Sequence, residues 1–176
     1  MTKSTLILLS LLFLYSCKTA IPASSEVPFI DTSYSVSVCN TPYKIEGMKQ
    51  GVPNLLGTFE IYHVESDSIS LHFSHQDTLI ITYLDSHVIK VKKLKGRFDS
   101  KGYFEIHLHN ESIEIPPLIP ILYSRHNINK VRLFLSADRT LVVDNKWLQG
   151  GNILILGAGD SGRRQSYFKT YPLKLN

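Results

Sequence analysis

Short runs in which apolar and polar residues alternate follow one another along most of the chain. The runs are rich in Ile, Val, Tyr, Phe and Thr, and Asp, Ser and Gly separate them, which is typical of strands joined by turns. No stretch longer than two turns keeps the 3.6-residue apolar period of an amphipathic helix. We therefore predict an all-β domain with strands within 34–38, 57–64, 69–73, 79–84, 88–95, 103–109, 131–135, 141–143 and 153–156.

The number and shortness of these segments suit two architectures. About eight or nine antiparallel strands can close into a barrel or pack as a two-sheet sandwich. Gly57-Thr58-Phe59, which open one of the segments, resemble the Gly-x-aromatic start of lipocalin-like barrels. That resemblance implies a barrel, and we expect a barrel in preference to a sandwich.

The segment 88–95 changes phase part of the way along. Ile89 and Val91 are apolar at odd positions, whereas Leu94 is apolar at an even position. A slip of one residue moves side chains to the other face of a strand. We therefore predict a β-bulge at Lys92 and Lys93 that returns Leu94 to the apolar face.

The densest run of positive charge lies in the same region and consists of Lys90, Lys92, Lys93, Lys95 and Arg97. Lysines on an edge strand discourage pairing with another sheet, which is the simpler interpretation. Contact with a phosphate-bearing lipid or a polyanionic glycan is the alternative.

The first sixteen residues follow a different pattern. Lys3 precedes an apolar run over 6–15 that only Ser10 interrupts, and Ser16 follows it. A positive start, an apolar middle and a small residue are the layout of a secretory signal peptide. The run of about ten residues is half the length that a membrane-spanning helix needs. We predict that residues 1–16 are removed on export.

Leu14-Tyr15-Ser16-Cys17 resembles the lipobox of bacterial lipoproteins. The resemblance implies that acyl chains such as palmitate are attached at Cys17, which becomes the new amino terminus. Tyr15 departs from the small or branched residue that is usual there. Enteric lipoproteins with Asp after the cysteine stay in the inner membrane, so Lys18 implies the outer membrane. No acidic cluster of the kind proposed to direct lipoproteins to the cell surface follows Cys17, so we expect the domain to face the periplasm.

The mature chain is expected to consist of a tether and one domain. Residues 18–33 contain Pro22, Pro28 and several Ser and Thr without a sustained apolar period, which is typical of a flexible linker. We predict a lipidated tether over 17–33 and a single β domain over 34–176.

The charge of the chain is mildly basic: Lys and Arg number 19 against 15 Asp and Glu. This mild and dispersed charge excludes the concentrated basic patch of a nucleic-acid binder.

The best candidates for metal ligands are Glu105, His107 and His109. Residues two apart on a strand share a face, so these three side chains would project together. Nitrogen and oxygen donors on one surface could hold zinc or copper with a fourth ligand from a neighbouring strand. The simpler interpretation is that Ile106 and Leu108 face the core and the three polar residues face water, so we assign no metal.

The stretch 157–162 contains two motifs that resemble functional segments. Its glycines fit GxGxxG, but the residues that follow contain no acidic residue and no helical pattern, which a dinucleotide site requires. Gly159-Asp160-Ser161-Gly162 resembles the nucleophile segment of trypsin-like proteases, yet no Ala-His-Cys segment precedes it. We interpret this stretch as a glycine-rich turn and expect no catalytic residue and no cofactor.

A Pro-rich apolar segment lies at 115–123. Its prolines exclude an interior strand or helix and favour an extended polyproline-like form. The apolar side chains either cap the open end of the core or stay exposed for a partner or ligand. The candidate contact residues are Pro116, Pro117, Leu118, Ile119 and Pro120.

These observations favour binding over catalysis. We expect a lipid-anchored cell-envelope protein that binds a small apolar ligand or an envelope protein partner and has no enzymatic activity. A structural or assembly-factor lipoprotein is the first alternative. A metal-binding protein that uses His107 and His109 is the second, and a hydrolase is the least favoured.

Overall fold

The computed structural model describes residues 30, 33–48, 51, 54–115, 122–154 and 156–171. The expected signal peptide, Cys17, most of the tether and the Pro-rich residues 116–121 lie outside the described residues. Among the helical residues described, none form a helix long and apolar enough to cross a membrane.

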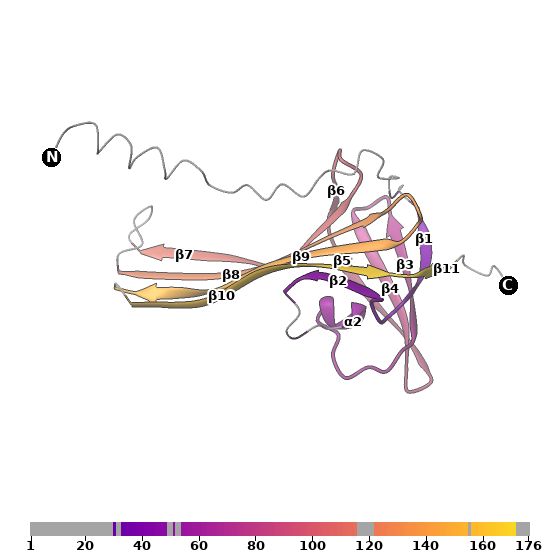
Figure 1. Cartoon of the computed structure of the whole chain (residues 1–176), viewed down its shortest axis with the longest axis horizontal. Coiled ribbons are helices and arrows are strands. Elements are labelled where there is room, and N and C mark those ends of the chain that lie inside the picture. The colour runs from indigo at the N-terminus through magenta and orange to yellow at the C-terminus, as the bar shows by residue number, and fades with distance from the viewer. Residues whose placement is uncertain are drawn as a thin grey trace.

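The described residues form two antiparallel sheets and one short helix (Figure 1). One sheet has five strands in the order β11-β1-β3-β4-β5, and the other has six in the order β2-β10-β9-β8-β7-β6. The elements are β1 (Ser35–Cys39), β2 (Lys44–Gly47), α2 (Leu55–Thr58), β3 (Ser68–Ser74), β4 (Thr78–Asp85), β5 (Val88–Lys95), β6 (Arg97–Phe98), β7 (Phe104–Ile115), β8 (Tyr123–Leu135), β9 (Leu141–Ile153), β10 (Leu156–Phe168) and β11 (Thr170–Tyr171).

The all-β prediction is confirmed, and the architecture is the sandwich-like one. The edge strands of the two sheets do not pair with each other, so the sheets do not close into a barrel and the preference for a barrel is wrong. The Gly-Thr-Phe sequence that resembles a lipocalin start does not open a strand, because Gly57 and Thr58 lie in α2 and Phe59 follows it. The strand expected at 57–64 is therefore also wrong.

The core lies between the two sheets. The ring of Phe73 in β3 contacts the ring of Phe104 in β7 edge-on, with 5.4 Å between centroids. Phe98 packs on the same Phe104 ring at 4.8 Å. Side chains from both sheets and from the α2 region surround these rings without solvent exposure, among them Val38, Leu55, Leu56, Phe59, Leu71, Leu79, Ile81, Leu133, Leu141 and Phe168.

Four strands of the larger sheet, β7 to β10, continue well past the core. Figure 1 shows them leaving the sandwich together, and we call their outlying part the extension. Burial changes along each strand: in β9 the first five residues are buried, whereas the rest are half-buried or exposed.

The sequence pattern locates only the buried ends of β7, β8 and β9, because hydrophobic alternation fades where the core ends. Residues 157–162 belong to β10, so their interpretation as a turn is wrong. The strand expected at 153–156 is also wrong, because Ile153 ends β9 and Leu156 begins β10.

The bulge predicted at Lys92 and Lys93 is wrong, because β5 pairs with β4 in unbroken register. Ile89 and Val91 are 71% and 55% exposed, so they do not need to share a face with the half-buried Leu94. The strand lies at the edge of its sheet, as its lysines indicate, and apolar residues stay exposed on its open side.

The register shift lies instead in β7, between His107 and His109. Lys130 of β8 pairs with His107, and the next residue back along β8, Asn129, pairs with His109, so Leu108 is one extra residue. A bulge of this kind reverses the face of every later side chain. His107 and His109 therefore lie on opposite faces of the sheet.

A buried side chain holds α2 against the sandwich. Asn40 follows β1 and is 3% exposed. Its Oδ1 accepts a hydrogen bond from the Leu56 N–H at 3.0 Å, and its Nδ2 donates to the Ser66 carbonyl at 2.8 Å. Asn54 caps the helix by accepting from the Gly57 N–H at 2.8 Å. The position of the chain that follows α2 thus depends on Asn40.

We predict that Asn40→Ala lowers the free energy of unfolding by about 1–3 kcal/mol, because it leaves the Leu56 N–H and the Ser66 carbonyl without this partner in a buried setting. Urea denaturation followed by circular dichroism measures the change. Asn54→Ala is the control, since loss of a helix cap costs about 1 kcal/mol. An Asn40→Ala effect no larger than that of the control would contradict the role given to Asn40.

Candidate functional site

Cross-strand pairing sorts the side chains of β7 to β10 into rows on the inner face, which we define as the face that carries the core. The rows are apolar inside the sandwich and become polar where the strands leave it. From β7 to β10 the successive rows are Phe104, Leu133, Val143 and Ser166; Ile106, Val131, Asn145 and Arg164; His109, Asn129, Trp147 and Gly162; and Glu111, Asn127, Gln149 and Asp160.

A cleft of about 530 Å³ lies where these polar rows meet the segment around α2. The inner face provides one side, and Gly57, Thr58, Glu60 and Tyr62 contribute from α2 and the residues after it. We call it the Arg164 cleft. The lining residues that bear on its chemistry are Glu60, His109, Asn129, Trp147, Asp160 and Arg164.

Arg164 is a buried cation without a carboxylate partner among the described residues. It is 6% exposed. Its Nη1 donates one long hydrogen bond, 3.5 Å, to the Gly51 carbonyl, and its guanidinium carbon lies 5.6 Å from the centre of the Trp147 ring. Burial lowers the pKa of Arg164. A desolvated guanidinium with most of its donors unused is a site for an anion.

Trp147 is fixed beside this guanidinium by its neighbours on β10. Its indole Nε1 donates to Asp160 Oδ2 at 3.0 Å. The ring lies over Gly162, where an added Cβ would come within 2.4 Å of it. Glycine at this position therefore leaves room for the indole, and a side chain there would displace it.

Polar contacts join the chain after α2 to the inner face. Glu60 has a positive φ of 59°, a conformation that is uncommon for a residue with a side chain. Its Oε1 lies 2.9 Å from His109 Nε2 and accepts a hydrogen bond from Asn129 Nδ2 at 3.3 Å. Asn129 Oδ1 in turn accepts from Asn145 Nδ2 at 2.8 Å. These contacts hold one wall of the cleft against its floor.

Several polar atoms of the cleft remain available for a ligand. Glu60 Oε2, Asp160 Oδ1 and Asn145 Oδ1 accept no hydrogen bond from the described residues. The side-chain amides of Asn127 and Gln149 line the same cleft and likewise bond to no described residue. Together with the guanidinium, the cleft offers both donors and acceptors.

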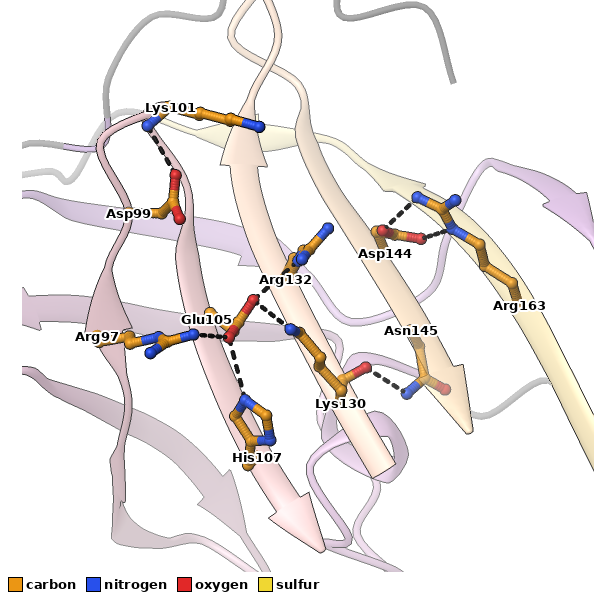
Figure 2. A network of polar contacts seen from close by, with 10 residues as sticks. All are labelled: Arg97, Asp99, Lys101, Glu105, His107, Lys130, Arg132, Asp144, Asn145 and Arg163. Atoms are coloured by element: carbon orange, nitrogen blue, oxygen red, sulfur yellow. Dashed lines mark hydrogen bonds and ion pairs between the residues drawn. The ribbon is translucent and has the colours of Figure 1, made fainter. Parts of the chain in front are cut away.

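The opposite, outer face carries a second charged cluster, drawn in Figure 2. Glu105 on β7 is only 2% exposed, although its sequence pattern indicates a solvated residue. Its Oε1 accepts from Arg97 at 2.8 Å and lies 3.0 Å from His107 Nε2. Its Oε2 lies 2.7 Å from Lys130 Nζ and 2.9 Å from Arg132 Nε. One carboxylate thus joins β6, β7 and β8.

The pKa of Glu105 reflects these contacts. Burial alone would raise the pKa, but hydrogen bonds from Lys130, His107, Arg132 and Arg97 outweigh it and hold the pKa well below its ordinary value. Further along the same face, Asp144 accepts two hydrogen bonds of 2.7 Å from Arg163 and joins β9 to β10. We interpret this outer cluster as a stabilising network, because its buried carboxylates are already fully paired.

The three candidate metal ligands do not all come together. Glu105 and His107 belong to the outer cluster, whereas the β7 bulge directs His109 to the inner face and to Glu60. The expectation that the three side chains share a face is therefore wrong. Among the residues that the structure describes, no group of three or more His, Cys, Asp or Glu could hold a metal ion.

The other candidates of the sequence lie away from the cleft or outside the described residues. The β5 lysines occupy an edge strand, where Lys92 Nζ donates to the Phe59 carbonyl at 2.9 Å. Arg97 belongs to the outer cluster instead. Pro116 to Pro120 fall outside the described residues, and the residues that flank this segment, Ile115 and Leu122, are 49% and 52% exposed.

The sequence pattern does not single out Arg164, because nothing in it shows that this guanidinium is buried. A weaker signal is visible in β8 and β9. Asn127 and Asn129 alternate with other residues, as do Asn145, Trp147 and Gln149, so each strand carries a polar face next to its apolar one. Which face meets the core depends on long-range pairing.

Searches of protein-family models, of curated proteins and of solved structures found no match to this chain.

We predict that Glu105→Gln lowers the free energy of unfolding by about 3 kcal/mol at pH 7, since it leaves buried cations without their carboxylate. The folded-state pKa of Glu105 lies below the unfolded value. Its contribution is thus present above the unfolded pKa of about 4.3 and is lost as the pH falls below it. Denaturant titrations between pH 7 and pH 2 measure both effects.

The control is Glu46→Gln, because Glu46 forms an exposed pair with Lys44 and such pairs contribute little. The wild type and the control should lose stability steeply on acidification, whereas Glu105→Gln should lose less. Equal slopes in all three proteins would show that Glu105 is not the main source of the pH dependence.

Proposed function

We propose that this chain is a non-catalytic binding protein whose Arg164 cleft holds a small polar ligand with an anionic group. The observation that carries the proposal is Arg164 itself, a guanidinium that is 6% exposed and has no carboxylate partner among the described residues. A buried charge is unfavourable unless it is paired. A carboxylate, sulfate or phosphate group on a ligand would complete the pair, and a carboxylate can accept two parallel hydrogen bonds.

The rest of the lining favours a ligand with several hydroxyl groups. A hydroxyl group donates and accepts hydrogen bonds, which suits a cleft with free acceptors on Glu60 and Asp160 and free amides on Asn127 and Gln149. Trp147 adds an amphipathic ring against which the carbon atoms of a sugar could pack. An acidic sugar combines these properties. This cleft therefore supports a polar ligand in place of the apolar ligand that the sequence suggests.

We propose binding in preference to catalysis because the main feature of the cleft is a guanidinium without a carboxylate partner among the described residues, which suits an anionic ligand. Both carboxylates of the cleft are held by ring N–H groups. Glu60 lies against His109, and Asp160 accepts from Trp147. Carboxylates fixed in this way act as positioned acceptors for ligand hydroxyl groups.

We further propose that the domain is attached to the cell envelope through acyl chains on Cys17 and faces the periplasm. Soluble sugars and cell-wall fragments would reach the cleft there.

The test compares D-glucuronate with D-glucose, which differ in the carboxylate. We predict that isothermal titration calorimetry detects glucuronate binding and that glucose binds at least about tenfold more weakly, since a hydrogen bond to a charged group contributes about 1.5–3 kcal/mol. Arg164→Gln should remove this preference. Lys146→Gln, which removes an exposed positive charge from the outer face, should leave binding unchanged.

Two results would contradict the proposal. One is equal affinity of the wild type for both sugars, or binding of neither at millimolar concentration. The other is an Arg164→Gln variant that keeps the wild-type preference for glucuronate and a wild-type circular dichroism spectrum.

A further inference from the structure

The outlying half of β10 has an unpaired edge. β9 pairs with β10 along its whole length, from Leu156 to Phe168. On the other side β2 pairs only with residues 164–167, so no described strand covers residues 156–161. All six of these residues are exposed.

The direction of the free backbone groups follows from the bonds that β10 makes nearby. The carbonyls of Arg163 and Tyr167 accept hydrogen bonds from Met48 and Tyr43 on the β2 side. In antiparallel sheets alternate residues direct both backbone groups to the same side. Gly157, Gly159 and Ser161 therefore direct their N–H and C=O groups away from β9, toward the open edge.

This edge differs from the β5 edge of the smaller sheet. β5 carries four lysines, Lys90, Lys92, Lys93 and Lys95, which natural sheets use to prevent pairing with another sheet. The 156–161 edge carries no lysine and no proline. Its charged residue, Asp160, accepts from Trp147 of the adjacent strand. Glycine at 157 and 159 leaves the outer face open to an approaching strand.

We propose that the β10 edge is the interface of a two-fold homodimer, in which residues 157–161 of two copies pair as antiparallel strands. Pairing about Gly159 places Gly157 opposite Ser161 of the second copy. It places Asp160 opposite Ala158 of the second copy, so no like charges face each other. The segment is thus complementary to itself, as a two-fold interface requires, and the two extensions form one continuous sheet.

The free edge of β7 fits a second copy less well. Beyond the bulge β7 carries Glu111 and Glu114, and pairing of β7 with β10 of another copy would bring these carboxylates toward Asp160. Such pairing is also head-to-tail and would continue into larger assemblies. The two-fold β10 pairing closes after two copies.

The experiment measures the mass of the full chain in solution by sedimentation equilibrium. The chain is produced in a bacterial host and purified in a density-matched detergent at about 1–100 μM. Ser161→Pro is the main variant, because it removes an N–H that points to the open edge and leaves the bonds to β9 in place. Ser161→Ala keeps that N–H and is the matched control. Ala158→Glu places a second carboxylate opposite Asp160 of the other copy, where like charges are unfavourable, and tests the interface without a change of backbone.

We expect a dimer for the wild type and for Ser161→Ala, and at least a tenfold weaker dimer for Ser161→Pro and Ala158→Glu. Circular dichroism shows whether each variant is folded, and Ala158→Glu decides the outcome if Ser161→Pro does not fold. A monomeric wild type over the whole range would overturn the proposal. So would assemblies larger than a dimer, or folded variants that dimerise as strongly as the wild type.

Discussion

The arrangement of both charged clusters depends on one extra residue in β7. Side chains alternate between the two faces of a strand, so Glu105, His107 and His109 would share a face in a regular strand. The shift at Leu108 separates them: Glu105 and His107 lie with the outer cluster, and His109 lies with Glu60 in the cleft. The same shift determines the face of every later residue of β7. Without it the inner face of the extension would lose the histidine that contacts Glu60.

The two clusters have opposite charge balances, which gives them different roles. On the outer face Glu105 is surrounded by Arg97, Lys130, Arg132 and His107, so its carboxylate has no capacity left for a ligand. On the inner face, the contacts of Arg164 with described residues are a long bond to a backbone carbonyl and a ring contact. We therefore interpret the outer cluster as stabilising the base of the extension, whereas the inner one keeps unused guanidinium donors for the proposed ligand.

The sequence predicts those features of the fold that local patterns determine. Alternation and β-forming composition indicate an all-β chain, and the lysines of 88–95 indicate an edge strand. The sandwich and the length of β7 to β10 depend on pairing between distant strands. Gly57 and Thr58 look like the start of a strand but form α2, because Asn40 and Asn54 supply the hydrogen bonds for a helical turn.

The site was harder to predict than the fold for a related physical reason. Burial of Glu105 and Arg164 depends on neighbours from other strands, and a one-residue bulge leaves no clear mark in a segment where hydrophobic alternation is already weak. Ile89 and Val91 gave a false signal of a bulge because apolar residues can remain exposed on an edge strand. Lipidation of Cys17 and contacts of Pro116 to Pro120 remain predictions, since these residues lie outside the described part of the chain.

The most direct test of this account is to record the imidazole NMR resonances of His107 and His109 in the wild type, in Glu105→Gln and in Glu60→Gln. We expect that Glu105→Gln changes the resonances of His107 and not those of His109, and that Glu60→Gln does the reverse. If either substitution changes both histidines to a similar extent, the two side chains share a face. The bulge at Leu108, and the separation of the cleft from the outer cluster, would then be wrong.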